Sequence, residues 1–425
     1  MKNTFYRFTF LTTVVFFFSL PSKAQFSLSG EFRPRLEYRH GYKQPVPSNA
    51  DPAFFVSQRT RLSGEYTTSL TRMMFSFQDV RTWGDLPQLS AANDKLTLHQ
   101  AWLEMKLFRD VLTLKAGRQE IIYDDSRLLG NVDWAQQGRS HDAMLLKYLK
   151  GKFRADLGMA FNQSGEPLLG TVYNVVGNYK ALQFLWIHQD FGKSGLSLVA
   201  INNGMQYHNT VDSTFSTVYS QTAGGRLTTS LGKLSIALAS YYQTGKNSSN
   251  KDLNAYYFAA EAGIPITDAF KINVGGEYLS GNSQLDQASK DKSFNPLYGT
   301  GHKFNGHMDY FYVGNHIGSV GLKDLYLDVR WKSAKSSVYL TTHLFAAAAD
   351  VADKTQPGKA MPSFLGTEFD LGVDFKVSSN LTAAAGYSHM LPTDTFISLR
   401  GGDKDQTHNW AWVMLIFKPI FIGAN

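Results

Sequence analysis

The sequence of 425 residues contains no cysteine, which excludes a disulfide framework and any thiolate metal site. After the first 20 residues it has no long apolar run either, because charged residues interrupt each one before the roughly 20 residues that a membrane-spanning helix needs. No segment combines low hydrophobicity with charge of a single sign, as disordered segments do. What remains is a chain rich in glycine (36) and aromatic residues (14%). It has the length for several soluble domains or for one large barrel.

Motifs for catalysis and nucleotide binding are also missing. The chain has no Gly-x-Ser-x-Gly elbow, no His-Glu-x-x-His pair and no Gly-Lys-Ser/Thr phosphate loop, and its 11 histidines lack ligand spacing. The net charge of +7 includes Lys2, Arg7 and Lys23 of the leader, and it is too mild and too evenly spread for nucleic-acid binding. We therefore expect no enzyme, cofactor, metal or nucleic-acid partner, and any transport is passive or driven by another protein.

The N-terminus has the pattern of a secretory signal. Lys2 and Arg7 precede an apolar segment at 8–20, and Ser22-Lys23-Ala24 resembles a small-residue cleavage site. The apolar segment is too short to span a bilayer as a helix. We expect residues 1–24 to be a signal peptide and residues 25–425 to form a single exported domain.

Two segments near the mature N-terminus alternate with a period of two. In 26–39, Phe26, Leu28, Phe32, Leu36 and Tyr38 share one face, and charged or hydroxyl side chains share the other. Residues 54–70 repeat the pattern. Such alternation predicts β-strands, but these are longer than the 5 to 6 residues usual in soluble sheets.

The connections between the predicted strands alternate in length. Short turns are expected near 69–71, 109–110, 150–151, 192–194, 231–233, 265–268, 332–335 and 378–379. Long polar connections are expected at 40–53, 83–95, 121–140, 164–176, 203–216, 245–253, 281–318, 346–362 and 391–406. Seventeen alternating connections join eighteen strands, the pattern of an outer-membrane barrel with short periplasmic turns and long outer loops. The sequence thus predicts an all-β, transmembrane antiparallel barrel of 18 strands, with 16 or 20 as alternatives if 307–313 forms a hairpin or 171–176 extends a strand.

The last strand and the paired aromatics agree with this architecture. Residues 409–417 are strongly apolar and aromatic, as the closing strand of such barrels commonly is, although Lys418 to Asn425 continue beyond it. Tyr241-Tyr242 and Tyr256-Tyr257-Phe258 fit either an interfacial girdle or ordinary core packing.

A barrel this wide encloses an aqueous lumen, and its lining is expected to be basic on one side. Eleven mature arginines precede Asp142 and only four follow it. Rows of arginine favour anionic solutes, because the guanidinium stays charged and pairs with carboxylate or phosphate through two parallel N–H bonds. The alternative is internal ion pairing that stiffens the wall, and the two interpretations are compatible.

The stretch 112–142 is unusually dense in charge, which suits either a cleft with paired carboxylates or the lining of a passage. Glu120, Asp124 and Asp125 would be the carboxylates of a glycosidase. Strand phase puts Arg118 opposite Lys115 and Gln119, pointing outward, unless Gly117 marks a bulge. Strand phase likewise puts Asp79 and Arg81 on the face opposite Ser76 and Gln78, pointing outward.

Six segments resemble the alginate-export family of outer-membrane porins, over about residues 30–145. They are 33–37 (RPRLE), 77–85 (FQDVRTWGD), 99–103 (HQAWL), 116–120 (AGRQE), 125–130 (DSRLLG) and 138–142 (GRSHD). Asp124 and His141 depart from the residues usual there, Gly and an aromatic. The resemblance implies an eighteen-stranded barrel with an Arg-lined constriction that passes an acidic polysaccharide. It places Arg81, Arg118, Glu120, Arg127, Arg139 and Asp142 in the lumen and its gating loop.

We therefore expect a passive channel in the outer membrane of a Gram-negative cell, surrounded by lipid, for anionic solutes such as alginate or another acidic saccharide. The expected path residues are Arg33, Arg35, Arg59, Arg61, Asp79, Arg81, Arg118, Glu120, Arg127, Arg139 and Asp142. The alternatives are a general diffusion porin for small solutes, a surface-loop adhesin or receptor, and an outer-membrane enzyme. Loop 281–318 is a candidate gate, and periplasmic export or uptake partners remain open.

Overall fold

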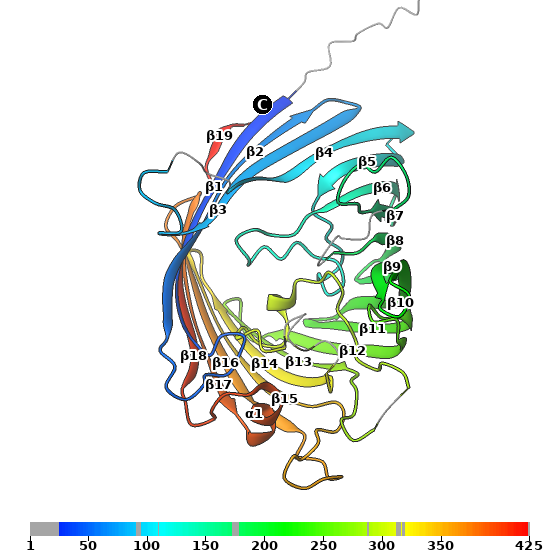
Figure 1. The fold of residues 1–425 in the computed structure, drawn as a ribbon. Coiled ribbons are helices and arrows are strands. Elements are labelled where there is room, and N and C mark those ends of the chain that lie inside the picture. The colour runs from blue at the N-terminus through cyan, green and yellow to red at the C-terminus, as the bar shows by residue number, and fades with distance from the viewer. Residues whose placement is uncertain are drawn as a thin grey trace, which may run out of the picture.

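Eighteen long strands follow one another along the chain, and each pairs antiparallel with the next (Figure 1). The computed structural model describes residues 25–90, 95–108, 110–171, 178–286, 289–311, 316 and 319–423; the predicted signal peptide lies outside them. The strands are β1 (Gln25–His40), β2 (Ala53–Thr67), β3 (Thr71–Thr82), β4 (Leu96–Phe108), β5 (Leu112–Gln119), β6 (His141–Lys150), β7 (Phe153–Phe161), β8 (Ala181–Phe191), β9 (Ser194–Asn209), β10 (Thr214–Leu231), β11 (Leu234–Lys246), β12 (Asp252–Pro265), β13 (Phe270–Leu279), β14 (Leu322–Lys332), β15 (Ser336–Ala346), β16 (Phe364–Lys376), β17 (Leu381–Pro392) and β18 (His408–Phe417).

The sheet closes on itself because β18 pairs with β1, from Phe32↔Phe417 to His40↔Asn409. After Pro419 a short strand, β19 (Ile420–Ile422), continues the pairing with β1 at Leu28. The residues that trail the closing strand thus extend the seam. Closure leaves no unpaired strand edge, which would be costly in lipid. The prediction of an 18-stranded transmembrane antiparallel barrel is confirmed.

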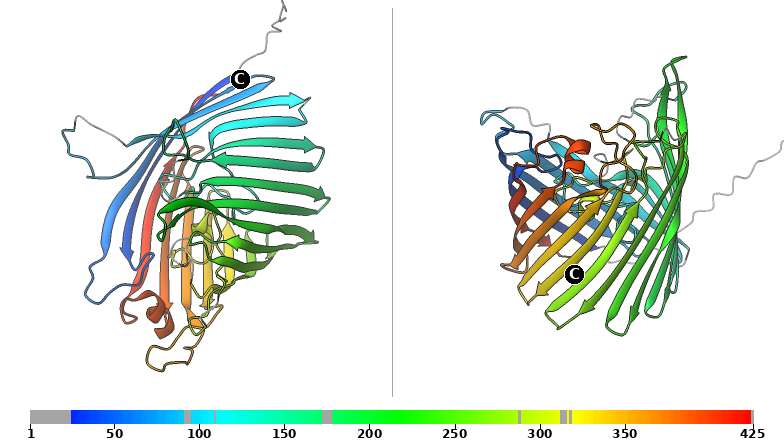
Figure 2. Two further views of the ribbon diagram at one scale, coloured as in Figure 1. Left: turned by 45° about the vertical axis from the view of Figure 1, so that its right-hand side comes forward. Right: turned by 90° about the horizontal axis from the view of Figure 1, so that it is seen from below.

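All eight predicted short turns join the expected strand pairs. One of the nine predicted long connections is wrong in extent. Most of 203–216 is strand, so that β9 joins β10 through 210–213, whereas β11 joins β12 through 247–251, within the predicted connection 245–253. The pairing of β8 stops at Gly204 and that of β11 starts at Ser220, so β9 and β10 project beyond their neighbours (Figure 2).

The two alternative strand counts have little support. The described part of 307–313, residues 307–311, contains no strand. The second proposal, an extension at 171–176, falls almost wholly outside the described residues.

Side chains alternate between an apolar outer face and a polar inner face. Leu62, Phe77, Leu103 and Val413 are 43 to 53% exposed on the outside, where lipid would cover them. Their strand neighbours point inward and carry most of the charge. Among the described residues, no helix is both long and apolar enough to cross a lipid bilayer.

Two connections fold into the barrel and meet there (Figure 1). We call residues 120–140 the first inner loop and residues 280–286 with 289–311 the second inner loop. They join through a parallel bridge between Leu129 and Tyr298, with hydrogen bonds from the Gly130 amide to the Tyr298 carbonyl and from the Thr300 amide to the Ser126 carbonyl. The buried apolar core lies around this junction and against the inner wall. Its members include Ile121, Leu128, Leu129, Tyr179, Leu182, Tyr241, Tyr257, Phe294, Leu297 and Met308.

Two short helices complete the structure. The 3-10 helix η1 (Gly301–Lys303) lies in the second inner loop, and α1 (Asp394–Arg400) lies in the connection before β18. The side chain of Thr393 caps α1 by accepting a hydrogen bond from the Phe396 amide.

Candidate solute path

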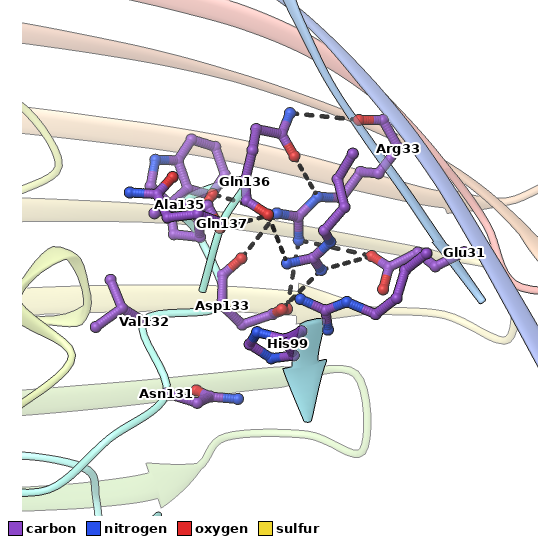
Figure 3. Close-up of polar contacts among 12 residues, drawn as sticks. Glu31, Arg33, His99, Asn131, Val132, Asp133, Ala135, Gln136 and Gln137 are labelled. Carbon is purple, nitrogen blue, oxygen red and sulfur yellow. Dashed lines mark hydrogen bonds and ion pairs between the residues drawn. The ribbon is translucent and has the colours of Figure 1, made fainter. Parts of the chain in front are cut away.

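Three arginines of β1 and β2 hold the first inner loop against the wall. The Arg59 guanidinium donates to Asp133 of the loop at 2.7 Å and to Glu31 of β1 at 2.6 Å. Arg33 donates to the Asp133 carbonyl at 2.8 Å and to the side chain of Gln136 at 3.1 Å. Figure 3 shows Asp133 and Gln136 pointing from the loop toward Arg33 and Glu31. The charges that sequence reasoning assigned to the solute are thus engaged by the protein's own loop.

The third anchor adds aromatic packing. Arg35 donates to the Trp134 carbonyl at 2.8 Å, and its guanidinium lies 4.1 Å from the centroid of the Trp134 ring. That ring stacks on His302 of the second inner loop and meets Trp410 and Trp412 of β18 edge-on. Trp134 therefore ties both inner loops to the seam of the barrel.

The electrostatics of this cluster favour the charged state of the loop. Burial by itself would raise the pKa of Asp133, but Arg59 and Arg33 outweigh burial and hold that pKa below its usual range. Arg59 is fully buried and Arg33 is 4% exposed. Removing one partner from such a cluster leaves a buried charge without compensation, at a cost of about 3–5 kcal/mol.

Four more of the predicted residues lie inside the barrel. Arg61 donates to Gln78 at 2.7 Å, and Glu120 contacts His99 at 2.8 Å and Asn131 at 3.0 Å. Arg139 donates to the Gly299 carbonyl at 3.0 Å, which joins the two inner loops. Arg127 is buried and donates to Glu277 of β13 at 2.7 Å. Its role is therefore to tie the first inner loop to the far wall.

The other four predicted residues form two ion pairs on the strands, and of these four Arg81 also lines the long-loop cavity described below. Arg118 pairs with Asp142 at 2.9 Å across β5 and β6, and Asp79 pairs with Arg81 on β3. Gln119 and His141, the neighbours of Arg118 and Asp142, are buried inward, so the pair points outward. Gly117 has a φ of +122° but shifts no register. The strand phase in the sequence indicated this placement, whereas the family resemblance implied the lumen.

A different set of cations lines the open space on either side of the first inner loop. On its long-loop side is a cavity of about 630 Å³ lined by Arg35, Arg39, Lys43, Arg81 and the rings of Tyr42 and Phe55, together with the carboxylates of Glu37, Asp85 and Asp309. Arg39 pairs with Glu37 at 2.8 Å. On its short-turn side is a cavity of about 780 Å³ that Lys106, Lys147 and Arg154 line together with the carboxylates of Glu104, Asp110, Asp124 and Asp156. Lys147 pairs with Glu104 at 3.0 Å. Lys115 also faces inward there, with its ammonium 4.0 Å from the Trp102 ring. We call Arg39, Lys43, Lys115, Lys147 and Arg154 the cationic track.

Sequence reasoning did not single out the cationic track. Lys115, Lys147 and Arg154 occupy inward positions of their strands. The period-two alternation that predicted inward arginines on β1 would therefore also have predicted these three cations in the lumen. Asp133, Trp134 and Gln136 were also missed as loop anchors, and no local pattern identifies them.

A second stretch of the wall, separated from β1 by β17 and β18, is rich in inward carboxylates. Its strands β13 to β16 carry Glu277, Asp324, Asp328, Glu368 and Asp370 on the inner face. Glu368 accepts from the Met308 amide at 2.7 Å and Asp370 from the His307 amide at 3.1 Å. Both acceptors are fully buried. This wall holds the second inner loop by its backbone.

The family model described as alginate export matches residues 24–164 and 206–410 of the chain. A search of curated protein sequences with this chain found no match.

Solved structures with similar folds include OccK9 (OpdG) of Pseudomonas aeruginosa, at 12% identity and a TM-score of 0.62, covering 93% of this chain and 98% of that one. OccAB1 of Acinetobacter baumannii has 11% identity and a TM-score of 0.63, with coverage of 95% and 99%. A BenF-like porin from Pseudomonas fluorescens Pf-5 has 12% identity and a TM-score of 0.61, with coverage of 94% and 99%. The barrel therefore has the fold of outer-membrane porins.

Proposed function

The chain belongs to the alginate-export family, and from this premise we propose that it is a passive outer-membrane channel for anionic solutes, with an acidic polysaccharide or oligosaccharide such as alginate as the expected solute. Residues 1–24 are the export signal in this proposal, and residues 25–425 are the mature barrel, embedded in outer-membrane lipid. The family and the porin fold favour a channel over an enzyme.

The observation that carries the proposal is the cationic track on both sides of the first inner loop. In the long-loop cavity, Glu37 is fully buried beneath the surface, whereas Arg39 remains partly exposed. The guanidinium of Arg39 lies 4.3 Å from the Tyr42 ring and 4.7 Å from the Phe55 ring. Charged donors next to aromatic faces suit a sugar acid, whose carboxylate pairs with the cation.

In this proposal the three anchoring arginines act indirectly. Arg33, Arg35 and Arg59 fix the loop that divides the lumen, and the solute passes the cations that remain unburied. The original path residues keep a role here as the frame of the constriction, apart from the pair Arg118–Asp142 and from Asp79, whose partner Arg81 lines the long-loop cavity.

Planar-bilayer recording in a salt gradient tests the proposal. We expect a reversal potential that indicates anion preference, and a reversible block of the current by a soluble polyuronate. Cation preference or the absence of conductance would contradict it.

A general diffusion porin for small solutes is the second candidate. Its support is the division of the lumen into cavities of about 600–800 Å³, which suit small molecules better than a polymer chain. The same recording separates the two candidates, because a general porin conducts ions but its current is indifferent to polyuronate.

A further inference from the structure

A third cavity, of about 620 Å³, lies between the second inner loop and the short-turn ends of β10 to β15. Its back wall carries alanine at three inward positions, Ala237, Ala239 and Ala259, and these small side chains leave the space open. Its loop side is closed by residues 303–307 and by Asp125. The volume is in the range of small-molecule sites.

The carboxylates around this cavity are almost all engaged. Asp328 accepts from Asn273, Arg330 and Thr341, and Asp324 accepts from His343 and Asn305. Glu277 accepts from Arg127, Tyr257 and Asn305, and Asp125 from Arg226 and the Arg127 amide. Among the described residues that line the cavity, Glu261 is the one carboxylate that keeps an oxygen without a hydrogen bond to another described residue, because Tyr326 donates to its other oxygen.

The cations retain most of their donors. The ammonium of Lys271 makes no hydrogen bond or ion pair with any described residue, although its backbone pairs within the sheet. Arg330 uses only its Nε, at 2.7 Å from Asp328, and its side chain is 58% exposed. Arg226 likewise uses only its Nε, at 2.9 Å from Asp125. The formal charges of the cavity nearly balance. The groups that still lack hydrogen-bond partners, however, are mostly N–H donors of the cations, and an anionic ligand would accept from them.

Two of these cations lie directly opposite each other. Lys271 of β13 is in register with Arg330 of β14, on the same inward face, and Arg330 is in register with Tyr339 of β15. Like charges directly opposite in a sheet destabilise it, and only Arg330 has a carboxylate partner. A bound carboxylate between them would relieve the repulsion.

We propose that this cavity is a binding site for a single carboxylate-bearing sugar unit, separate from the cationic track. The carboxylate binds between Lys271 and Arg330, and a sugar hydroxyl donates to the free oxygen of Glu261. Placed toward the short-turn end, the site holds one unit of the solute on the periplasmic side of the inner loops. The proposal rests on the proposed function for its choice of sugar acid.

Isothermal titration calorimetry on the purified full-length barrel in detergent tests it, with glucuronate as the probe and glucose and glucosamine as the neutral and cationic controls. We expect glucuronate alone to bind, and Lys271→Gln with Arg330→Gln to weaken binding at least tenfold. Lys335→Gln, in the short turn that follows β14, is the matched control and should leave binding unchanged. Heat-dependent mobility in SDS gels verifies that each variant is folded.

The site is refuted if glucuronate does not bind the native barrel, or binds the double variant as tightly. A Glu261→Met variant, whose side chain has no oxygen to accept from the hydroxyl, adds a second criterion: it should reduce the preference for glucuronate over acetate, which carries no hydroxyl. The recording in a salt gradient separates this proposal from the proposed function. Anion selectivity without glucuronate binding refutes the site alone, and binding without anion selectivity refutes the channel proposal alone.

Discussion

The two walls that hold the inner loops do so with opposite chemistry. The β1–β2 wall supplies donors, the guanidinium groups of Arg33, Arg35 and Arg59, to acceptors of the first inner loop. The β16 wall supplies acceptors, the carboxylates of Glu368 and Asp370, to backbone amides of the second inner loop. The comparison shows that a charged side chain on the lumen wall does not necessarily contact a solute. Many of these side chains are paired with the inner loops, and selectivity depends on the charged groups that remain accessible.

The largest effect should follow from breaking the basic wall at Arg59. Arg59→Met leaves the buried Glu31 with only its longer contact to Arg33, at 3.8 Å in place of 2.6 Å. We therefore expect a loss of up to about 3–5 kcal/mol in stability and release of the first inner loop. Thermal unfolding and current noise in a bilayer measure the two effects. Arg72→Met is the control, because its ion pair with Glu65 is half exposed and should contribute at most about 1 kcal/mol. Equal losses in both variants would contradict the anchoring role.

Breaking the acidic wall should cost less. Gly306 has a φ of +82°, and a Cβ there would lie 2.5 Å from the Glu368 carboxylate. We expect Gly306→Ala to cost about 1–3 kcal/mol and to expose the second inner loop to limited proteolysis. Gly84→Ala is a matched control, since Gly84 has a similar φ of +88° but nothing within 4 Å. If the two variants behave alike, backbone strain rather than the contact with Glu368 explains the loss.

A smaller effect should follow from acidification. Because the pKa of Asp133 is lowered in the folded state, its contribution is fully present above the unfolded pKa of about 3.9 and is lost as the pH falls through the folded pKa. The side chain is 49% exposed, so solvent screening limits the contribution to less than about 1 kcal/mol. Current noise measured from pH 6 to pH 3 should rise at the acid end, and Asp133→Asn should be noisier at pH 6 with a flatter profile. If the Asp133→Asn variant shows the same dependence of current noise on pH as the native barrel, another group is responsible for the titration.

The smallest effect is expected on the outer face. Arg118→Gln with Asp142→Asn removes an exposed ion pair, side chains 41% and 63% exposed, that points away from the lumen. We expect no change in ion selectivity and at most about 1 kcal/mol in stability. A shift in the reversal potential would contradict this and would indicate that the pair Arg118–Asp142 contributes to the solute path.

The strands were predictable because each one repeats a period-two pattern and because loop length alternates between the two ends of the barrel. The alternation of side chains in the sequence also predicted that Arg118 points outward. The predicted connection 203–216 was misread as loop, because the ends of β9 and β10 project beyond the neighbouring strands there, where no lipid imposes the apolar alternation. The anchoring of Arg33 by Gln136 was out of reach, because its partners are 103 residues apart and only the folded loop brings them together.

The central claim is that solute selectivity resides in the unburied cations and not in the buried arginines. The reversal potential of a variant with Arg39→Gln, Lys115→Gln and Arg154→Gln, compared with the native barrel in the same salt gradient, tests it most directly. The account predicts that the anion preference of the native channel largely disappears while single-channel current remains steady, because the loop anchors are intact. An unchanged reversal potential would contradict it.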